Sequence, residues 1–95
     1  MQIESLKVYC DLVDTTSFSL AAERNGITQS AVSQQIRCLE NRYGAIFFER
    51  GKRHFAVTPE GRVFEHAARE IIKILEGVGT KLRELETVVS GRAIP

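Results

Sequence analysis

The chain has 95 residues, of which 43% are hydrophobic and 26% charged, and its net charge is +1. These values are ordinary for a small globular domain with an appendage. They argue against a membrane protein, because no apolar run approaches the roughly 20 residues that a spanning helix needs. The N-terminus lacks a basic segment followed by an apolar stretch, so we expect no signal peptide and a cytoplasmic location.

Positive charge is concentrated in the middle of the chain. Residues 1–23 carry a net charge of −3, and residues 24–53 hold six basic against two acidic side chains, a net charge of +4. Residues 54–95 are balanced. A local positive field favours a polyanionic partner, most simply nucleic acid, whereas the small overall charge argues against a non-specific polycation.

The two cysteines, Cys10 and Cys38, lie far apart and belong to no CxxC or Cys/His cluster. They predict neither a metal site nor a cofactor. We expect free thiols that serve as small core residues, with a disulfide or a redox role left open.

Two short helices are predicted first. The range 3–14 carries apolar residues on one helical face, and Ser19 is a suitable N-cap for a second helix over 20–24. Asn25 and Gly26 then form a strong turn signal, because both residues tolerate positive φ. The face of the first helix consists of Ile3, Leu6, Cys10 and Val13.

The next segment, 28–44, predicts a helix with two different faces, capped by Thr28 and ended by Gly44. Its apolar face consists of Val32, Ile36, Leu39 and Tyr43. Its polar face consists of Gln29, Ser30, Ser33, Gln34 and Arg37. Amide and guanidinium groups pair bidentately with base edges, and serine is an adaptable partner.

This polar face alone is equally consistent with an ordinary surface helix rich in Gln and Ser. The preceding short helix and the Asn25-Gly26 turn give the spacing of a helix-turn-helix, in which the second helix of the motif enters the major groove of DNA. Together with the local charge, this spacing favours a base-reading helix over a plain surface helix.

A two-stranded hairpin is predicted after Gly44. The arms are 45–50 and 54–58, and the tip contains Lys52 and Arg53. Such a hairpin is marginal alone and must pack on the helices. Its basic tip is typical of a wing that reaches phosphates or a narrow minor groove, although a solvated turn is the alternative.

The last predicted helix runs from Pro59 to about Ser90, with Thr58 as N-cap and Pro59 at the first helical position. Its length is roughly 45–50 Å at 1.5 Å per residue. Its apolar residues recur every seven positions: Phe64, Ala68, Ile71, Leu75, Val78, Leu82, Leu85 and Val89.

The distal half of this helix extends beyond any domain of under 60 residues, so its apolar positions predict a second copy of the chain as partner. Gly77 and Gly79 each cost about 1 kcal/mol in a helix interior, and we expect them to permit a bend or a close crossing of helices. Antiparallel packing is one such arrangement, but the pattern leaves the orientation open.

The ordered motifs resemble the N-terminal region of LysR-type transcriptional regulators. The resemblance covers residues 1 to about 90. The matching segments are SFSLAAER at 17–24, TQSAVSQQIR at 28–37, LE at 39–40, FER at 48–50 and TPEG at 58–61.

The resemblance implies a mainly α fold: a winged helix-turn-helix at 1–58 and a dimerising linker helix at 59–90. Residues 91–95 would begin a hinge to an effector-binding domain that binds a small molecule and is absent from this chain. Family members are commonly tetramers on double-stranded operators with an interrupted inverted repeat. The implied partners are therefore DNA and further copies of the chain.

The resemblance also assigns roles by position. Residues 29, 30, 33 and 34 would read the major groove, Arg37 would lie nearer the backbone, and Arg53 would enter the minor groove. Further phosphate contacts are implied for Ser17, Ser19, Thr28 and Arg50. The chain departs from the family at Ser30, where Pro is usual, so base preference at that step is expected to differ.

Two other classes of function fit the sequence less well. A protein-interaction module would explain the helices but not the basic segment. An enzyme is disfavoured, because His54 and His66 lack catalytic partners at readable spacing and no glycine-rich phosphate loop is present.

Overall fold

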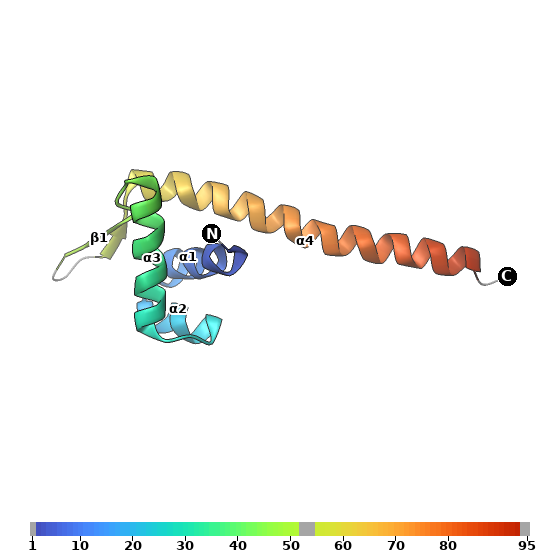
Figure 1. The fold of residues 1–95 in the computed structure, drawn as a ribbon, viewed down its shortest axis with the longest axis horizontal. Helices are drawn as coiled ribbons and strands as arrows, with labels where there is room; N and C mark the ends of the chain where they lie inside the picture. The colour runs from blue at the N-terminus through green and yellow to red at the C-terminus, as the bar shows by residue number, and fades with distance from the viewer. Residues whose placement is uncertain (1, 52–54, 94–95) are drawn as a thin grey trace.

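The computed structural model describes residues 2–51 and 55–93, with side chains described as far as residue 88. It confirms a mainly helical fold with a two-stranded wing and a long last helix (Figure 1). The elements in order are α1 (Ile3–Thr15), α2 (Phe18–Asn25), α3 (Gln29–Tyr43), β1 (Phe48–Arg50), β2 (Phe55–Val57) and α4 (Pro59–Ala93).

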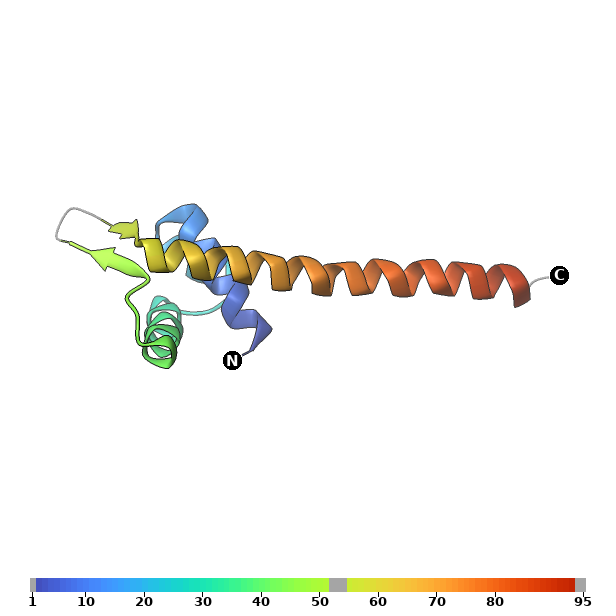
Figure 2. The same ribbon diagram turned by 90° about the horizontal axis from the view of Figure 1, so that it is seen from above.

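The molecule consists of a head and an arm. The helices α1, α2 and α3 and the hairpin form the head, and α4 starts beside them and runs straight out of it (Figure 2). The molecule measures 66 × 24 × 19 Å along its principal axes. The head therefore carries the core, while most of α4 has no neighbour within the chain.

The start of α2 differs from the sequence prediction. Its N-cap is Ser17, whose Oγ accepts a hydrogen bond from the backbone N–H of Leu20 at 3.1 Å. The predicted cap, Ser19, lies inside the helix and is exposed. The helix starts early because the aromatic ring of Phe18 packs on that of Phe55, with centroids 5.5 Å apart.

The predicted ends of α3 are confirmed. Thr28 has extended backbone and its Oγ1 accepts from the backbone N–H of Ala31 at 3.0 Å. Gly44 follows the helix at φ +62°, a left-handed conformation that glycine adopts without penalty. The chain therefore leaves α3 in a defined direction, toward β1.

The core of the head lies where the three helices meet the hairpin. Its buried members are Val8, Tyr9, Leu12, Val13, Ala21, Ala22, Val32, Ile36, Leu39, Phe47 and Phe48. The helix periods predicted four of them correctly: Val13, Val32, Ile36 and Leu39. The helix α1 is buried on more than its predicted face, because Val8, Tyr9 and Leu12 join this core, whereas the predicted Leu6 and Cys10 form a second cluster with Ala68. Tyr43, also predicted on the apolar face of α3, is 51% exposed. It lies at the end of α3, where only the rings of Phe47 and Phe64 approach it, at 6.3 and 5.4 Å.

The hairpin is antiparallel, with Phe48 opposite Val57 and Arg50 opposite Phe55. The paired strands are shorter than the predicted arms. The predicted basic tip, including Lys52 and Arg53, lies outside the described residues. The described base of the hairpin is fixed by apolar packing, because Phe48 is buried and stacks on Phe55 at 5.2 Å.

The start of α4 is joined tightly to the head. Thr58 caps it as predicted, with its Oγ1 accepting from the backbone N–H of Gly61 at 2.9 Å. The buried hydroxyl of Tyr9 donates to the backbone oxygen of Gly61 at 2.6 Å. A Cβ at Gly61 would clash with the backbone oxygen of Phe47. Glycine is thus required here for close approach rather than for its φ angle.

Beyond the head, α4 continues without a break through Gly77 and Gly79 to Ala93, three residues past the predicted end. Of the two expectations for these glycines, a bend is not seen (Figures 1 and 2), and a close crossing with a second helix stays a prediction. None of the described helices combines the length and apolarity that crossing a membrane requires.

The two environments of glycine on α4 predict opposite effects of the same substitution. Gly61→Ala should lower the free energy of unfolding by about 1–3 kcal/mol, because backbone atoms cannot move aside for the new Cβ. Gly77→Ala, with no neighbouring atom within 4 Å, should raise helix stability by about 1 kcal/mol. Urea unfolding followed by circular dichroism measures both. Equal losses at the two positions would contradict the close packing at Gly61.

Candidate nucleic-acid interface

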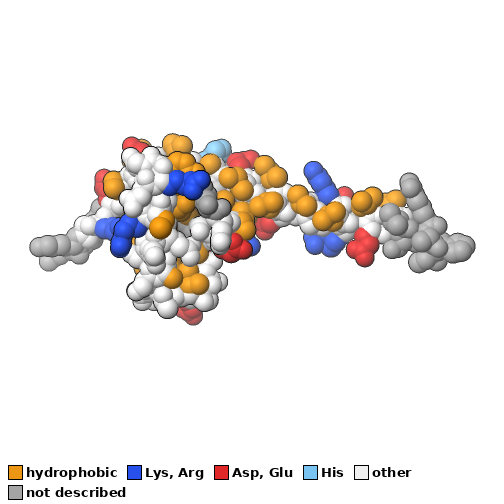
Figure 3. Space-filling view, viewed as in Figure 1, with side chains coloured by type: hydrophobic (Ala, Val, Ile, Leu, Met, Phe, Trp, Pro, Cys, Tyr) orange, Lys and Arg blue, Asp and Glu red, His pale blue; other side chains and the backbone are white. Residues whose placement is uncertain are grey.

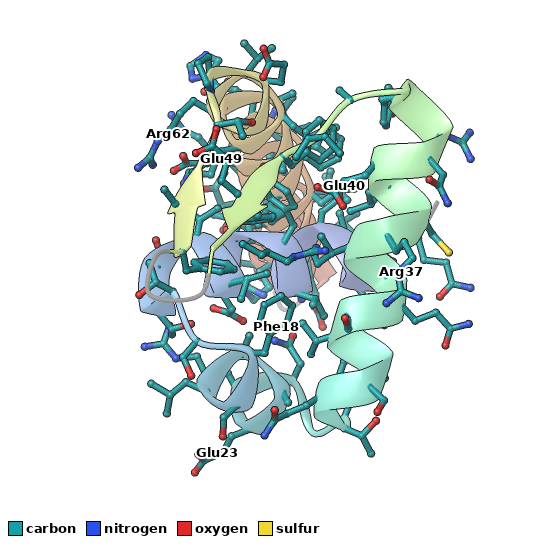
Figure 4. The ribbon with its side chains drawn as sticks, turned by 90° about the vertical axis from the view of Figure 1, so that its left-hand side faces the viewer. Phe18, Glu23, Arg37, Glu40, Glu49 and Arg62 are labelled. Carbon is teal, nitrogen blue, oxygen red and sulfur yellow. The ribbon has the colours of Figure 1, made fainter. Side chains whose placement is uncertain are left out.

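The polar residues predicted to contact DNA project from one side of α3. Gln29, Ser30, Gln34 and Arg37 are exposed, and Ser33 is half-buried. In Figure 4 Arg37 projects from α3 on the face that also carries the hairpin and the start of α2. The structure thus brings the major-groove candidates, the base of the wing and the first turn of α2 onto one side of the head.

Two hydroxyls predicted to contact phosphate are already engaged as helix caps. Ser17 Oγ and Thr28 Oγ1 each accept a backbone N–H. A hydroxyl that accepts a hydrogen bond can still donate its own proton to a phosphate oxygen. Both caps also stand at helix N-termini, where partial positive charge favours an anion.

Glu40 joins the end of α3 to the start of the wing. Its carboxylate is buried, and Oε2 accepts from the backbone N–H groups of Phe47 at 2.8 Å and Phe48 at 3.3 Å. Oε1 lies 3.4 Å from Nη2 of Arg50. A single side chain thus connects α3, the connecting segment and β1.

Phe18 joins α2 to the same part of the wing. Its ring meets Phe55 edge to face, and the guanidinium of Arg50 lies 5.6 Å from its ring centroid. Figure 4 shows Phe18 in the space between α2, α3 and the hairpin. Arg50 therefore has two fixed neighbours, an aromatic face from α2 and a carboxylate from α3.

A hollow of about 470 Å³ lies between α3 and the wing. Its lining includes the guanidinium-bearing residues Arg37 and Arg50, the amide Asn41 and, at its base, Glu40. The predicted tip cations, Lys52 and Arg53, are outside the described residues. Two cationic side chains, Arg37 and Arg50, therefore line one opening beside α3.

The predicted seam along α4 is buried only beside the head. Ala68 is buried and Phe64 half-buried, whereas the side chain of Val89 is outside the described residues. The remaining members are 43–60% exposed: Ile71, Leu75, Val78, Leu82 and Leu85. Figure 3 shows apolar side chains continuing along the arm.

An apolar groove of about 430 Å³ adjoins the proximal end of this seam. It lies where α4 meets α1 and the end of α3. Its lining includes Leu6, Tyr43, Phe47, Val63 and Ile71. The partial exposure of Tyr43 is thus part of a larger uncovered apolar surface.

Buried and paired groups in the head have shifted pKa values. Burial raises the pKa of Tyr9 and of Cys10. Burial also acts to raise the pKa of Glu65, but hydrogen bonds from Arg62 and Arg69 outweigh it and lower that pKa overall. Arg69 also donates to Asp14 at 2.6 Å, which fastens α4 to α1. These shifts describe how the arm is attached rather than a catalytic site.

Sequence reasoning did not assign roles to Glu40, Phe18 or Tyr9. A signal existed for Glu40, because it continues the step of four from Val32 and Ile36 and so places an acid on the apolar face. The contact of Phe18 with Phe55 had no such signal, because it joins segments 37 positions apart. The expectation of a buried thiol holds for Cys10 but is wrong for Cys38, which is exposed on α3.

Comparison with known proteins gives a consistent result. The family described as "Bacterial regulatory helix-turn-helix protein, lysR family" matches residues 3–62. An uncharacterized HTH-type transcriptional regulator of Azotobacter vinelandii is 37% identical over 92 residues, 97% of this chain and 64% of the relative. The activator BauR of Pseudomonas aeruginosa is 33% identical over 94% of this chain and 29% of its own length.

A solved structure, that of the BenM DNA-binding domain with catB site 1 DNA, superposes with a TM-score of 0.82 at 29% identity. The match covers 90% of this chain and 96% of that one. The chain thus spans less than two thirds of the two curated relatives but almost all of the solved DNA-binding domain.

The different surroundings of the two cysteines predict different thiol reactivity. Cys38 should react quickly with a disulfide reagent in the folded protein, whereas Cys10, buried and with a raised pKa, should react only on unfolding. Spectrophotometric thiol titration with and without urea measures this. Cys38→Ser should remove the fast phase, and a fast phase that survives the substitution would contradict the assignment.

Proposed function

Because the chain belongs to the lysR family of bacterial regulatory helix-turn-helix proteins, we propose that it binds double-stranded operator DNA sequence-specifically, as a dimer, for a transcription regulator. The observation that carries this proposal is the common face of α3, α2 and the wing, with its exposed amide, hydroxyl and guanidinium groups. The neighbouring solved domain is itself a DNA complex.

In the proposed complex α3 lies in the major groove. Gln29, Ser30, Ser33 and Gln34 read base edges, and Arg37 contacts the backbone beside them. Amides pair bidentately with adenine, and the serine hydroxyl can pair with a donor or an acceptor on a base edge. Ser30 keeps a backbone N–H and adds a hydroxyl where the family usually has Pro, so the base selected at this step is expected to differ from that of Pro-bearing relatives.

The wing and the caps supply contacts to the DNA backbone. Arg50, Ser17, Ser19 and Thr28 are proposed phosphate partners. Lys52 and Arg53, in the tip, are proposed for the adjacent minor groove, where negative potential is strong when the groove is narrow.

The dimer is proposed to form through α4 with the two helices antiparallel. Burying each large apolar side chain gains roughly 1.5–3 kcal/mol, and the described distal seam residues are exposed. Antiparallel pairing places Leu82 and Leu85 of one copy near the apolar groove beside Phe64 and Ile71 of the other. A two-fold dimer then requires an inverted-repeat operator, interrupted between its half-sites.

We further propose that residues 1–58 form the DNA-binding unit, that 59–90 form the linker and dimerisation helix, and that 91–95 begin a hinge. The curated relatives are longer than this chain. In a complete regulator of this kind, a small-molecule effector would act through a domain after the hinge, and tetramers would form on the operator.

A protein-interaction module is the competing hypothesis, and DNA titration separates the two. We expect retention of pooled genomic fragments at low salt, a steep fall in affinity as salt rises, and a remaining preference for particular fragments at moderate salt. Fluorescence anisotropy at two salt concentrations measures this. No binding at low salt would contradict the proposed function.

Gln29→Ala tests base reading by α3. We expect a loss of about 1–3 kcal/mol confined to one base position, because a bidentate amide contact discriminates at a single pair. Competition with single-base operator variants measures it. Gln35→Ala, on the half-buried side of the same helix, serves as control. A uniform loss on all sequences would make Gln29 a phosphate contact instead.

Leu82→Glu combined with Leu85→Glu tests the seam. Two buried charges should break the dimer, giving monomers in sedimentation equilibrium and weaker operator binding. Thr80→Glu with Thr87→Glu adds the same charge to the opposite side of α4, and this control should remain dimeric. If the leucine double variant stays dimeric, the seam does not carry the interface.

A further inference from the structure

The carboxylate of Glu40 is unusual in its position, because it is buried on a helix whose outer face meets a polyanion in the proposed complex. Its side chain is 8% exposed. Two backbone N–H groups donate to Oε2. A neutral oxygen acceptor could accept these two hydrogen bonds, so they do not require a charged carboxylate. Among the residues that the structure describes, the negative charge itself is matched by one cation, Arg50, through Oε1. The negative charge of Glu40 is therefore expected to act on Arg50.

The guanidinium of Arg50 is held from two directions. Glu40 faces one of its nitrogens at 3.4 Å, and its central carbon Cζ lies over the ring of Phe18, 5.6 Å from the ring centroid. The side chain of Arg50 remains 39% exposed. Because a guanidinium has five N–H donors in a fixed plane, donors remain for a third partner once these contacts are made.

The place that remains for this partner is the hollow between α3 and the wing. Arg37 and Arg50 both line it. If α3 occupies a major groove and the wing tip the adjacent minor groove, the phosphate strand that separates the two grooves has to pass between them. The hollow is lined by the second half of α3, by the connecting residues 44–46 and by Arg50 of β1, so a strand that passes between the helix and the base of the wing would meet its two arginines.

We propose that Glu40 and Phe18 are positioning residues that hold Arg50 at the edge of this hollow for a phosphate of the strand between the two grooves. The inference rests on the proposed DNA binding and deepens it. Glu40 fixes the direction of the guanidinium and joins it to the recognition helix, and Phe18 fixes its plane. This arrangement fixes the position of the phosphate contact relative to the base contacts of α3.

The sign of one substitution separates this account from simple electrostatics. Removing a negative charge near DNA ordinarily strengthens binding. On the positioning account Glu40→Gln weakens it, by roughly three- to tenfold, because Arg50 loses its charged partner and its fixed direction. Glu49→Gln is the matched control, since Glu49 lies next to Arg50 on β1 and projects to the other side of the strand (Figure 4). It should leave binding unchanged or slightly stronger.

The experiment is a double-variant cycle on the 95-residue chain with one operator duplex, measured by anisotropy over a series of salt concentrations. Arg50→Ala should reduce the slope of log affinity against log salt by about one. Adding Glu40→Gln to Arg50→Ala should cost little more, because Glu40 acts through Arg50. Full additivity of the two losses, or stronger binding by Glu40→Gln, would overturn the proposal.

A second pair of variants tests the proposal if Glu40→Gln destabilises the fold. If Glu40→Gln melts at a much lower temperature, Phe18→Leu and Arg50→Lys replace it. Phe18→Leu keeps an apolar side chain but removes the aromatic face, and Arg50→Lys keeps the charge but removes the planar group. Each should weaken binding while Phe18→Leu has no effect in the Arg50→Ala background. An unchanged affinity in both variants would overturn the proposal. Failure of the unsubstituted chain to bind DNA would instead overturn the proposed function.

Discussion

The structure depends most on the burial of Tyr9. Its ring packs against Phe47, Phe48 and Phe64 with centroids 4.7–5.7 Å apart, and its hydroxyl donates to the backbone oxygen of Gly61. One side chain of α1 therefore contacts the connection after α3, the first strand of the wing and the start of α4. An unpaired buried hydroxyl would be costly, so the hydrogen bond and the aromatic packing require each other. The absence of a side chain at Gly61 is what lets α4 approach closely enough for both.

This arrangement explains how a small head can carry a long, largely uncovered helix. The first turns of α4 belong to the core, and the ion pair of Arg69 with Asp14 adds a second attachment to α1. Beyond this point the helix leaves its apolar seam in solvent. A rigid attachment means that pairing of two arms would fix the positions of two heads relative to each other. The same aromatic cluster thus stabilises the fold and, in the proposed dimer, sets the separation of two reading helices.

Local signals in the sequence were sufficient for most of the fold. The caps Thr28 and Gly44 and the period of Val32 and Ile36 are properties of neighbouring residues, and all appear as predicted. The prediction failed where distant segments decide. Ser17 and Ser19 are equally good caps by residue type, and the packing of Phe18 on Phe55 selects the first. The helix period places Glu40 on the apolar face, but the backbone N–H groups that it binds come from the next element and had no signal in the sequence. The positions of the α3 side chains were predictable from periodicity, whereas the hollow beside them was not.

In the proposed complex α3 reads base sequence, and two copies of the chain do so together. Selection of bound duplexes from a random pool by the unsubstituted chain tests it most directly. The account predicts enrichment of two related half-sites, arranged as an inverted repeat with a constant separation. A pool that is retained by the chain but shows no shared sequence after selection would contradict it, because phosphate contacts alone would then explain all of the binding.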